Sequence, residues 1–284
     1  MADDLGRSAG FGRGAIAVLF GLAAAAVAAA PFATAGAGEP PPGSNAGPPY
    51  DFTTEIMDSD ALEYGLRDKA MLTKTDLGYR FRAGNQNSRL VMTVVDAGLR
   101  VADTGTESFI ELPASCKPAT VQVGIAAVCP IPAGITRDLP LLIEVWPRLG
   151  DDYTDSSALP ATFAVAVLGD AGHDVARFGA GRDYFNGFSG RDVVWGGAEN
   201  DWIRAGSDND EVNGGAGSDD IVAVQGNDTL RGRDGLDRIW GGDGDDQMWG
   251  GPGADVLQCG NGNDSATVDA GDRIARSCES IATG

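Results

Sequence analysis

The sequence predicts an all-β protein, a parallel β-roll (a β-solenoid) preceded by a β-rich N-terminal cap. Three observations carry this prediction. An aspartate recurs every nine residues across residues 169–267, glycine is concentrated in the first half of each nine-residue unit, and an apolar residue stands at the eighth position. A fixed short period of this kind is typical of a solenoid, in which each repeat contacts only its neighbours.

The repeat array consists of eleven consecutive nonads, all with Asp at the sixth position and nine with Gly at the fourth. The glycine-rich half favours a turn, because glycine admits positive φ. The second half favours a short strand with its eighth residue pointing inward. Two nonads then make one coil, with a strand on each side and an apolar column between them. The expected column is Val194, Ile203, Val212, Ile221, Leu230, Ile239, Met248 and Leu257, with smaller layers at Ala176 and Ala266.

The eleven aspartates fall on two edges of the expected roll, because same-side loops recur every eighteen residues. Edge 1 carries Asp174, Asp192, Asp210, Asp228, Asp246 and Asp264, and edge 2 carries Asp183, Asp201, Asp219, Asp237 and Asp255. A hard cation such as calcium takes about six to eight oxygen ligands, which loop carbonyls and a carboxylate in every loop can supply. The alternative is that the aspartates only form turns and hold no metal.

The nonads resemble the hemolysin-type, or RTX, calcium-binding repeat GGxGxDxUx, where U is a large apolar residue. The resemblance implies that several Ca²⁺ ions sit between successive loops of one edge and are shared by their aspartates. The best-formed loops are Gly214–Asp219, Gly241–Asp246, Gly250–Asp255 and Cys259–Asp264, so tighter sites are expected toward the C-terminal half. The implied ligand set is the eleven aspartates with Gly214, Gly217, Gly241, Gly244, Gly250 and Gly253.

Some nonads depart from this pattern. Glu199 and Asp208 replace the fourth-position glycine, and Val224 and Arg233 replace the second-position glycine. Arg182 and Arg191 stand directly before an expected ligand. These loops are expected to be the weaker ones.

Charge agrees with a cation site. The array holds 19 Asp and Glu against 7 Arg and no Lys, so it carries about twelve of the chain's 20 net negative charges. Without a cation such a ribbon repels itself, which predicts that calcium is part of the fold. A pI near 4.2 argues against a nucleic-acid partner, which would need a basic patch.

The N-terminus predicts export. Arg7 and Arg13 precede an uncharged apolar run at 15–30, and small residues follow. This is typical of a signal peptide, here residues 1–35 with cleavage after Ala35 or, as second choice, Ala37. The alternative is an N-terminal membrane anchor. Residues 36–50 predict a disordered Pro/Gly linker. We expect a secreted, extracellular protein with no transmembrane segment in the mature chain.

Four cysteines suggest two disulfides in an exported chain. Proximity favours Cys116 with Cys129 and Cys259 with Cys278, although the sequence permits three connectivities. A zinc site is the alternative, but the chain has no CxxC spacing. The second pair would tie the last coil to residues 268–284, which no longer follow the nonad and are expected to form a C-terminal cap.

Residues 51–168 predict a β-rich leader that packs on, or merges with, the first coil. Apolar alternations at 89–96, 120–128, 141–146 and 162–168 favour strands. Residues 53–76 fit one helix or a loose strand pair. The segment Leu149–Ser157 looks like a worn calcium-repeat loop. The leader is also similar to that of secreted RTX repeat proteins of the actinobacterial type, in which a β-rich segment with a Cys-containing hairpin precedes the coils.

Motifs for catalysis are absent from the sequence. The single histidine, His173, lies inside the first nonad, and neither HExxH nor GxSxG occurs. Outward ninth positions carry Trp195, Trp240 and Trp249, which could bind a glycan or simply cover the sheets, and Arg231 could stack on Trp249.

We therefore expect a secreted calcium-binding β-roll with a structural or adhesive role and no enzymatic activity, whose partners beyond calcium would be envelope glycans or proteins. The alternative is an RTX module that aids export and folding, with a leader that binds a partner or carries an unrecognised hydrolase activity.

Overall fold

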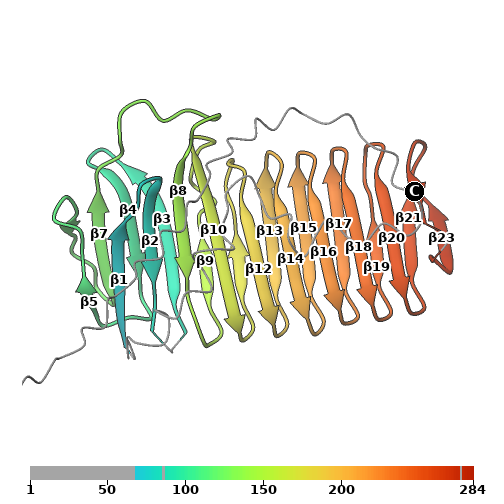
Figure 1. Ribbon diagram of the computed structural model, residues 1–284, viewed down its shortest axis with the longest axis horizontal. Helices are drawn as coiled ribbons and strands as arrows, with labels where there is room; N and C mark the ends of the chain where they lie inside the picture. Colours follow the sequence, from blue (N-terminus) through green and yellow to red (C-terminus); the bar gives the residue numbers. More distant parts are fainter. Residues whose placement is uncertain (1–67, 85–86, 276) are drawn as a thin grey trace, which may run out of the picture. The chain divides into compact units, whose positions relative to one another are not determined.

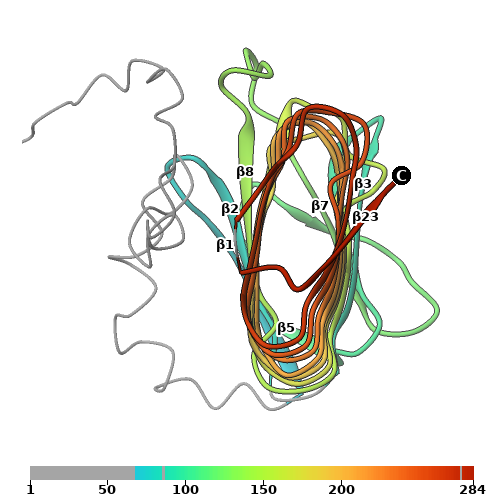
Figure 2. The same cartoon turned by 90° about the vertical axis from the view of Figure 1, so that its right-hand side faces the viewer.

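The computed structural model describes residues 68–84, 87–275 and 277–284. The expected signal peptide at 1–35 and linker at 36–50 lie outside these residues. Every element within the described part is a β-strand, and no helix occurs there, as the repeat pattern predicts. The strands form two sheets. Figure 2, a view along the axis on which the coils stack, shows the two sheets facing each other with turns at both edges.

Sheet A contains eleven strands among the described residues. They are β1 (Lys69–Lys74), β2 (Gly78–Arg82), β5 (Ser108–Glu111), β8 (Leu141–Trp146), β10 (Phe163–Ala171), β12 (Tyr184–Ser189), β14 (Trp202–Ser207), β16 (Asp220–Gln225), β18 (Arg238–Asp243), β20 (Val256–Asn261) and β22 (Arg273–Ile274).

Sheet B contains twelve strands in the same part of the chain. They are β3 (Arg89–Val95), β4 (Gly98–Asp103), β6 (Lys117–Pro118), β7 (Ile125–Cys129), β9 (Tyr153–Asp155), β11 (Val175–Arg177), β13 (Val193–Ala198), β15 (Glu211–Ala216), β17 (Thr229–Asp234), β19 (Gln247–Trp249), β21 (Ser265–Val268) and β23 (Ser280–Thr283).

Consecutive strands of the array alternate between the sheets, and each pairs in parallel with the strand one coil later (Figure 1). The register is eighteen residues, so Ile203 lies opposite Ile221 and Val212 opposite Leu230. The eighth-position side chains consequently form one apolar column, and none is more than 2% exposed. Phe185 also belongs to this column and fills the layer after Ala176, a contribution that the sequence analysis missed.

The leader shares both sheets with the array. β8 pairs in parallel with β10, and β9 pairs in parallel with β11, so the coil begins before the first nonad. The antiparallel hairpins β1–β2 and β3–β4 join it through parallel β2–β8 and β3–β9 pairs. A single buried cluster therefore extends from Ala70 in β1 to Cys278 near the C-terminus.

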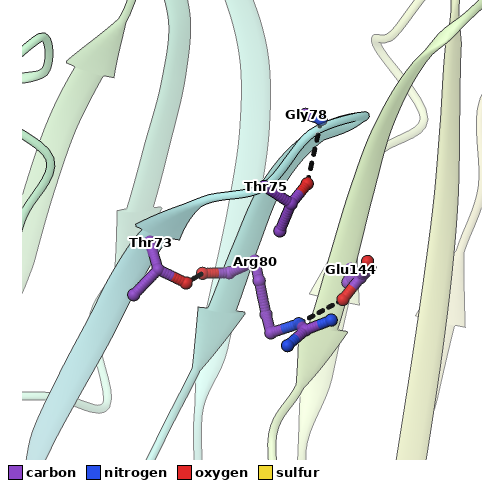
Figure 3. A network of polar contacts seen from close by, with 5 residues as sticks. All are labelled: Thr73, Thr75, Gly78, Arg80 and Glu144. Atoms are coloured by element: carbon purple, nitrogen blue, oxygen red, sulfur yellow. Dashed lines mark hydrogen bonds and ion pairs between the residues drawn. The ribbon is translucent and has the colours of Figure 1, made fainter. Parts of the chain in front are cut away.

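A small polar network fixes the first hairpin to β8 (Figure 3). The backbone N–H of Gly78 donates to Oγ1 of Thr75 at 2.9 Å, which closes the turn between β1 and β2. Arg80 forms an ion pair with the buried carboxylate of Glu144. The Arg80 guanidinium also lies 4.5 Å from the centre of the Trp146 ring, so the outer face of sheet A is covered by side chains from two strands.

The structure corrects one expectation for the leader and tests only part of another. The strand predicted at 120–128 begins only at Ile125, because Gly124 has φ +79° and packs so closely on Asp103 that a Cβ there would lie 2.0 Å from the Asp103 carbonyl oxygen. This tight turn prevents the residues before Ile125 from joining the strand. Of the segment 53–76, the part from Lys69 to Lys74 is strand β1, and residues 53–67 lie outside the described residues.

Both disulfides favoured by proximity form. Cys116 joins Cys129 across the β6–β7 hairpin, and Cys259 of β20 joins Cys278 of the tail. No free cysteine occurs in the described residues, which leaves none for the alternative zinc site. All four residues belong to the main buried cluster. The second disulfide closes the C-terminal end of the apolar column.

The substituted glycine positions keep the left-handed backbone that glycine would adopt. Glu199 and Asp208 have φ of 74° and 79°, while Val224 and Arg233 have φ of 101° and 85°. A β-branched residue at such a φ is strained, because its Cβ crowds the backbone. Val224 is therefore the most costly departure from the repeat pattern.

Replacing Val224 by glycine should raise the free energy of unfolding by about 1 kcal/mol, because it relieves this strain. The same change at the adjacent exposed strand residue, Gln225→Gly, should lower stability by up to about 1 kcal/mol through backbone entropy. Urea unfolding of both variants at saturating calcium measures the difference. Equal destabilisation by the two changes would show that φ at Val224 carries no strain.

Candidate metal centre

The sixth-position aspartates lie where each turn enters a strand, in two rows on the two edges. All eleven are buried, with exposures of 0–4%. The carbonyl oxygen of each of these residues accepts the backbone hydrogen bond that starts the next parallel strand on its side, as in Glu211 N–H to Asp192 O at 2.8 Å. Each turn therefore places one buried carboxylate at an equivalent position in every coil.

Each row is held by a hydrogen-bond ladder. The backbone N–H of one aspartate donates to Oδ1 of the aspartate eighteen residues later, over 2.7–2.9 Å. Asp228, for example, donates to Asp246, and Asp246 donates to Asp264. One oxygen of every carboxylate is committed to the backbone of the preceding coil.

The second oxygen of every aspartate in both rows is buried and has no hydrogen-bond partner. Buried polar atoms are normally satisfied, and an unsatisfied one costs roughly 1–3 kcal/mol, more if charged. The eleven unpartnered oxygens occupy equivalent positions, and cations bound between successive coils along each edge would satisfy them. The residues present therefore fit calcium, which prefers oxygen ligands.

Glycine at the first position of the nonad makes room for this oxygen. A Cβ added to Gly214, Gly241 or Gly250 would lie 2.2–2.5 Å from Oδ2 of the aspartate in the same loop. Their φ angles are not in the left-handed region, so the space beside the carboxylate, rather than turn conformation, requires glycine there.

The other three glycines of the expected ligand set stand at the fourth position. Gly217 and Gly244 have φ of 145° and 135°, and a Cβ on either would lie 1.8 Å from a carbonyl oxygen of the preceding loop. Gly253 makes an equally close approach to the Gly235 carbonyl oxygen. These residues therefore bring successive loops into backbone contact.

Burial raises the pKa of the row carboxylates. Desolvation is the largest cause, and it brings the pKa of Asp192 and Asp210 to about 8 and that of Asp237 and Asp246 to about 7. Repulsion from neighbouring carboxylates of the same row adds to the effect, whereas the backbone hydrogen bond opposes it. Ionised together, the rows are unfavourable unless a positive charge lies among them.

The ladders extend past the nonads at both ends, which the period-nine pattern did not reveal. At the C-terminal end, the N–H of Asp255 donates to Asp272 Oδ1 and the N–H of Asp264 donates to Glu279 Oε2, both at 2.9 Å. At the N-terminal end, the N–H of Asp152 donates to Asp174 Oδ1 at 3.0 Å. The spacings here are 17, 15 and 22 residues rather than 18.

A second, exposed ladder runs along edge 1 through the fifth positions. The N–H of Asn227 donates to Asn209 Oδ1, and the N–H of Asp245 donates to Asn227 Oδ1, at 2.8 and 2.9 Å. His173 takes the same place, with Nδ1 accepting from the N–H of Arg191 at 2.9 Å. The single histidine is thus an exposed rung of a structural ladder.

No group of three or more His, Cys, Asp and Glu side chains suited to a metal occurs among the residues that the structure describes. The rows explain this, because each coil contributes one carboxylate per edge. A cation between two coils would have to complete its shell with backbone carbonyls and water.

The family model described as RTX calcium-binding nonapeptide repeat (4 copies) matches residues 186–221, 222–257 and 249–272. Residues 186–272 are RTX calcium-binding nonapeptide repeats. No curated protein and no solved structure matches the chain. The RTX match begins within the second nonad, yet Asp174 and Asp183 before it have the same burial, ladder bond and unpartnered oxygen as the RTX aspartates.

In a chelator, the RTX array should be more stable near pH 5 than near pH 8. The folded-state pKa values of about 6 to 8 exceed the unfolded value of about 3.9. The folded state therefore binds more protons between these values, and stability falls as pH rises through them. Circular dichroism in EDTA at the two pH values tests this, because it reports the folded fraction even where the metal-free chain is largely unfolded. A metal-free protein that is equally or less stable at pH 5 would contradict it.

Proposed function

We propose that this protein is a calcium-loaded β-roll that acts outside the cell in a structural or adhesive role and has no catalytic activity. The observation that carries the calcium assignment is the pair of rows of buried, unpartnered aspartate oxygens. Calcium would be held by these carboxylates, with loop carbonyls completing its coordination, and it would supply the positive charge that the rows lack.

The spacing of the coils favours calcium over magnesium. Neighbouring parallel strands lie about 4.8 Å apart. An ion midway between oxygens separated by one strand spacing would lie roughly 2.4 Å from each, within the calcium range of about 2.3–2.6 Å and beyond the magnesium range of about 2.0–2.1 Å. The repeat of the sheet thus matches the larger ion.

Extracellular action is supported by two disulfides, since such bonds persist in oxidising compartments. The apolar run near the N-terminus, read as a signal peptide, adds to this. No helix capable of crossing a membrane occurs in the described residues.

A structural role is supported by what covers the sheets. On sheet B, the guanidinium groups of Arg177 and Arg231 lie 4.6 and 4.8 Å from the ring centres of Trp195 and Trp249. Trp240 lies on the opposite sheet and is 9% exposed. Trp195 and Trp249 stack against neighbouring coils, whereas the Trp240 Nε1–H donates to Gln258 on the other sheet. The three side chains therefore do not form one continuous exposed strip, which favours sheet cladding over a glycan-binding surface.

Replacing Asp246 by asparagine tests the calcium assignment. Asn keeps an oxygen for the Asp228 N–H but removes the buried charge, so bound calcium should fall by roughly two ions, because Asp246 contacts both neighbouring loops. Asp245→Asn is the matched control, since it removes the same charge from the adjacent exposed residue, where Asn already stands in other loops. Calorimetry counts the ions. Equal counts for Asp246→Asn and Asp245→Asn would make the row aspartates turn formers only.

A further inference from the structure

The loop Gly150–Asp152, at the junction of leader and array, reproduces the second half of a repeat turn although it lies outside the nonads. The N–H of Gly150 donates to Ala171 O at 3.2 Å, as the N–H of Gly172 does to Ser189 O at 3.1 Å. The N–H of Val175 donates to Asp152 O at 2.8 Å. The loop therefore stacks on the first nonad as one nonad stacks on the next.

The side chains of this loop occupy the same two ladders as those of the repeats. Oδ1 of Asp151 accepts from the N–H of His173 at 2.9 Å in the outer ladder. Oδ1 of Asp152 accepts from the N–H of Ser88 at 2.5 Å in the inner ladder. Asp151 and Asp152 thus stand at the fifth and sixth positions of a repeat turn, within the segment Leu149–Ser157 that the sequence marks as a worn calcium-repeat loop.

Two oxygens at this level are buried and unpartnered. Asp152 is 3% exposed and Ser88 is 1% exposed. Neither Oδ2 of Asp152 nor Oγ of Ser88 has a hydrogen-bond partner. They come from segments 64 residues apart, yet the hydrogen bond from the Ser88 N–H to Asp152 brings the two residues together.

We propose that Asp152 and Ser88 form an additional calcium site that joins the leader to the first coil of the roll. This inference rests on the proposed calcium-binding function and extends it to residues outside the repeats. Asp152 would supply a charged oxygen and Ser88 a neutral one, with carbonyls of the two turns completing the set. The site would fasten residues 87–88 to the loop Gly150–Asp152 and so couple order in the leader to calcium.

The other ends of the two rows lack these features. Edge 2 begins with the N–H of Val165 on Asp183 Oδ1, and valine offers no side-chain oxygen. At the C-terminal end, Asp272 accepts from Asp255 at Oδ1 and from Asp269 at Oδ2, so both of its oxygens are engaged. At the C-terminal end of edge 1, Glu279 is exposed and contributes no buried, unpartnered oxygen. The additional site is therefore specific to the N-terminal end of edge 1.

The test is calcium counting by equilibrium dialysis on the full chain with its disulfides intact. Asp152→Asn keeps an acceptor for the Ser88 N–H and removes the buried charge, so it should bind about one ion fewer than wild type. Asp151→Asn is the matched control, because it removes the same charge from the adjacent exposed residue and keeps the acceptor for His173. It should bind as many ions as wild type.

The outcomes separate this site from the repeat sites. If wild type binds no calcium, the proposed function fails. If wild type binds calcium and Asp152→Asn binds equally many ions, the function stands and the additional site is overturned. Should Asp152→Asn fail to fold in excess calcium, Ser88→Ala decides, because it removes only an unpartnered hydroxyl. Weakening of one binding step by roughly tenfold supports the site, and unchanged binding overturns it.

Discussion

One hydrogen bond sets the geometry of every coil: the backbone N–H of an aspartate donates to Oδ1 of the aspartate one coil later. It fixes the eighteen-residue register on both edges at once. The parallel strands, the apolar column and the close contacts of the turn glycines all follow that register. Because Oδ1 is committed to the backbone, Oδ2 is left buried without a hydrogen-bond partner, and a cation there would satisfy it.

This arrangement makes stability depend on charge. The apolar column is narrow, with one eighth-position side chain per nonad, and the array carries a large negative charge. In the metal-free state, burial and mutual repulsion disfavour the ionised rows, as the raised pKa values indicate. On the proposed function, a bound cation would reverse the sign of that contribution, and ligand binding and folding would become one equilibrium.

The sequence predicted the parts of the structure that are locally encoded. Asp at every sixth position predicted the two edges, and the apolar eighth positions predicted the column. Proximity favoured the Cys259–Cys278 pair. Parallel pairing of identical turns requires no long-range information, which is why these predictions hold.

What the sequence could not predict depends on contacts between distant segments. The sequence marked Leu149–Ser157 as a worn repeat loop but did not place Asp152 in the row. The reason is that 22 residues separate it from Asp174, because the chain between Tyr153 and Val165 is longer than the corresponding part of a nonad. Asp272 and Glu279 end the rows at spacings of 17 and 15 residues, because the chain that leads to them is shorter than two nonads. The leader hairpins join the sheets through pairs such as β2–β8, which no periodicity encodes.

The most direct test of the calcium-dependent fold is far-ultraviolet circular dichroism of the full chain, disulfides intact, during a calcium titration from a chelator. At neutral pH the spectrum should change from largely disordered to β-sheet, with a midpoint at a calcium concentration of about 10⁻⁴ to 10⁻³ M, the range of extracellular modules. Magnesium at the same concentrations should not reproduce the change. A β-sheet spectrum that is identical in chelator and in excess calcium would contradict the account.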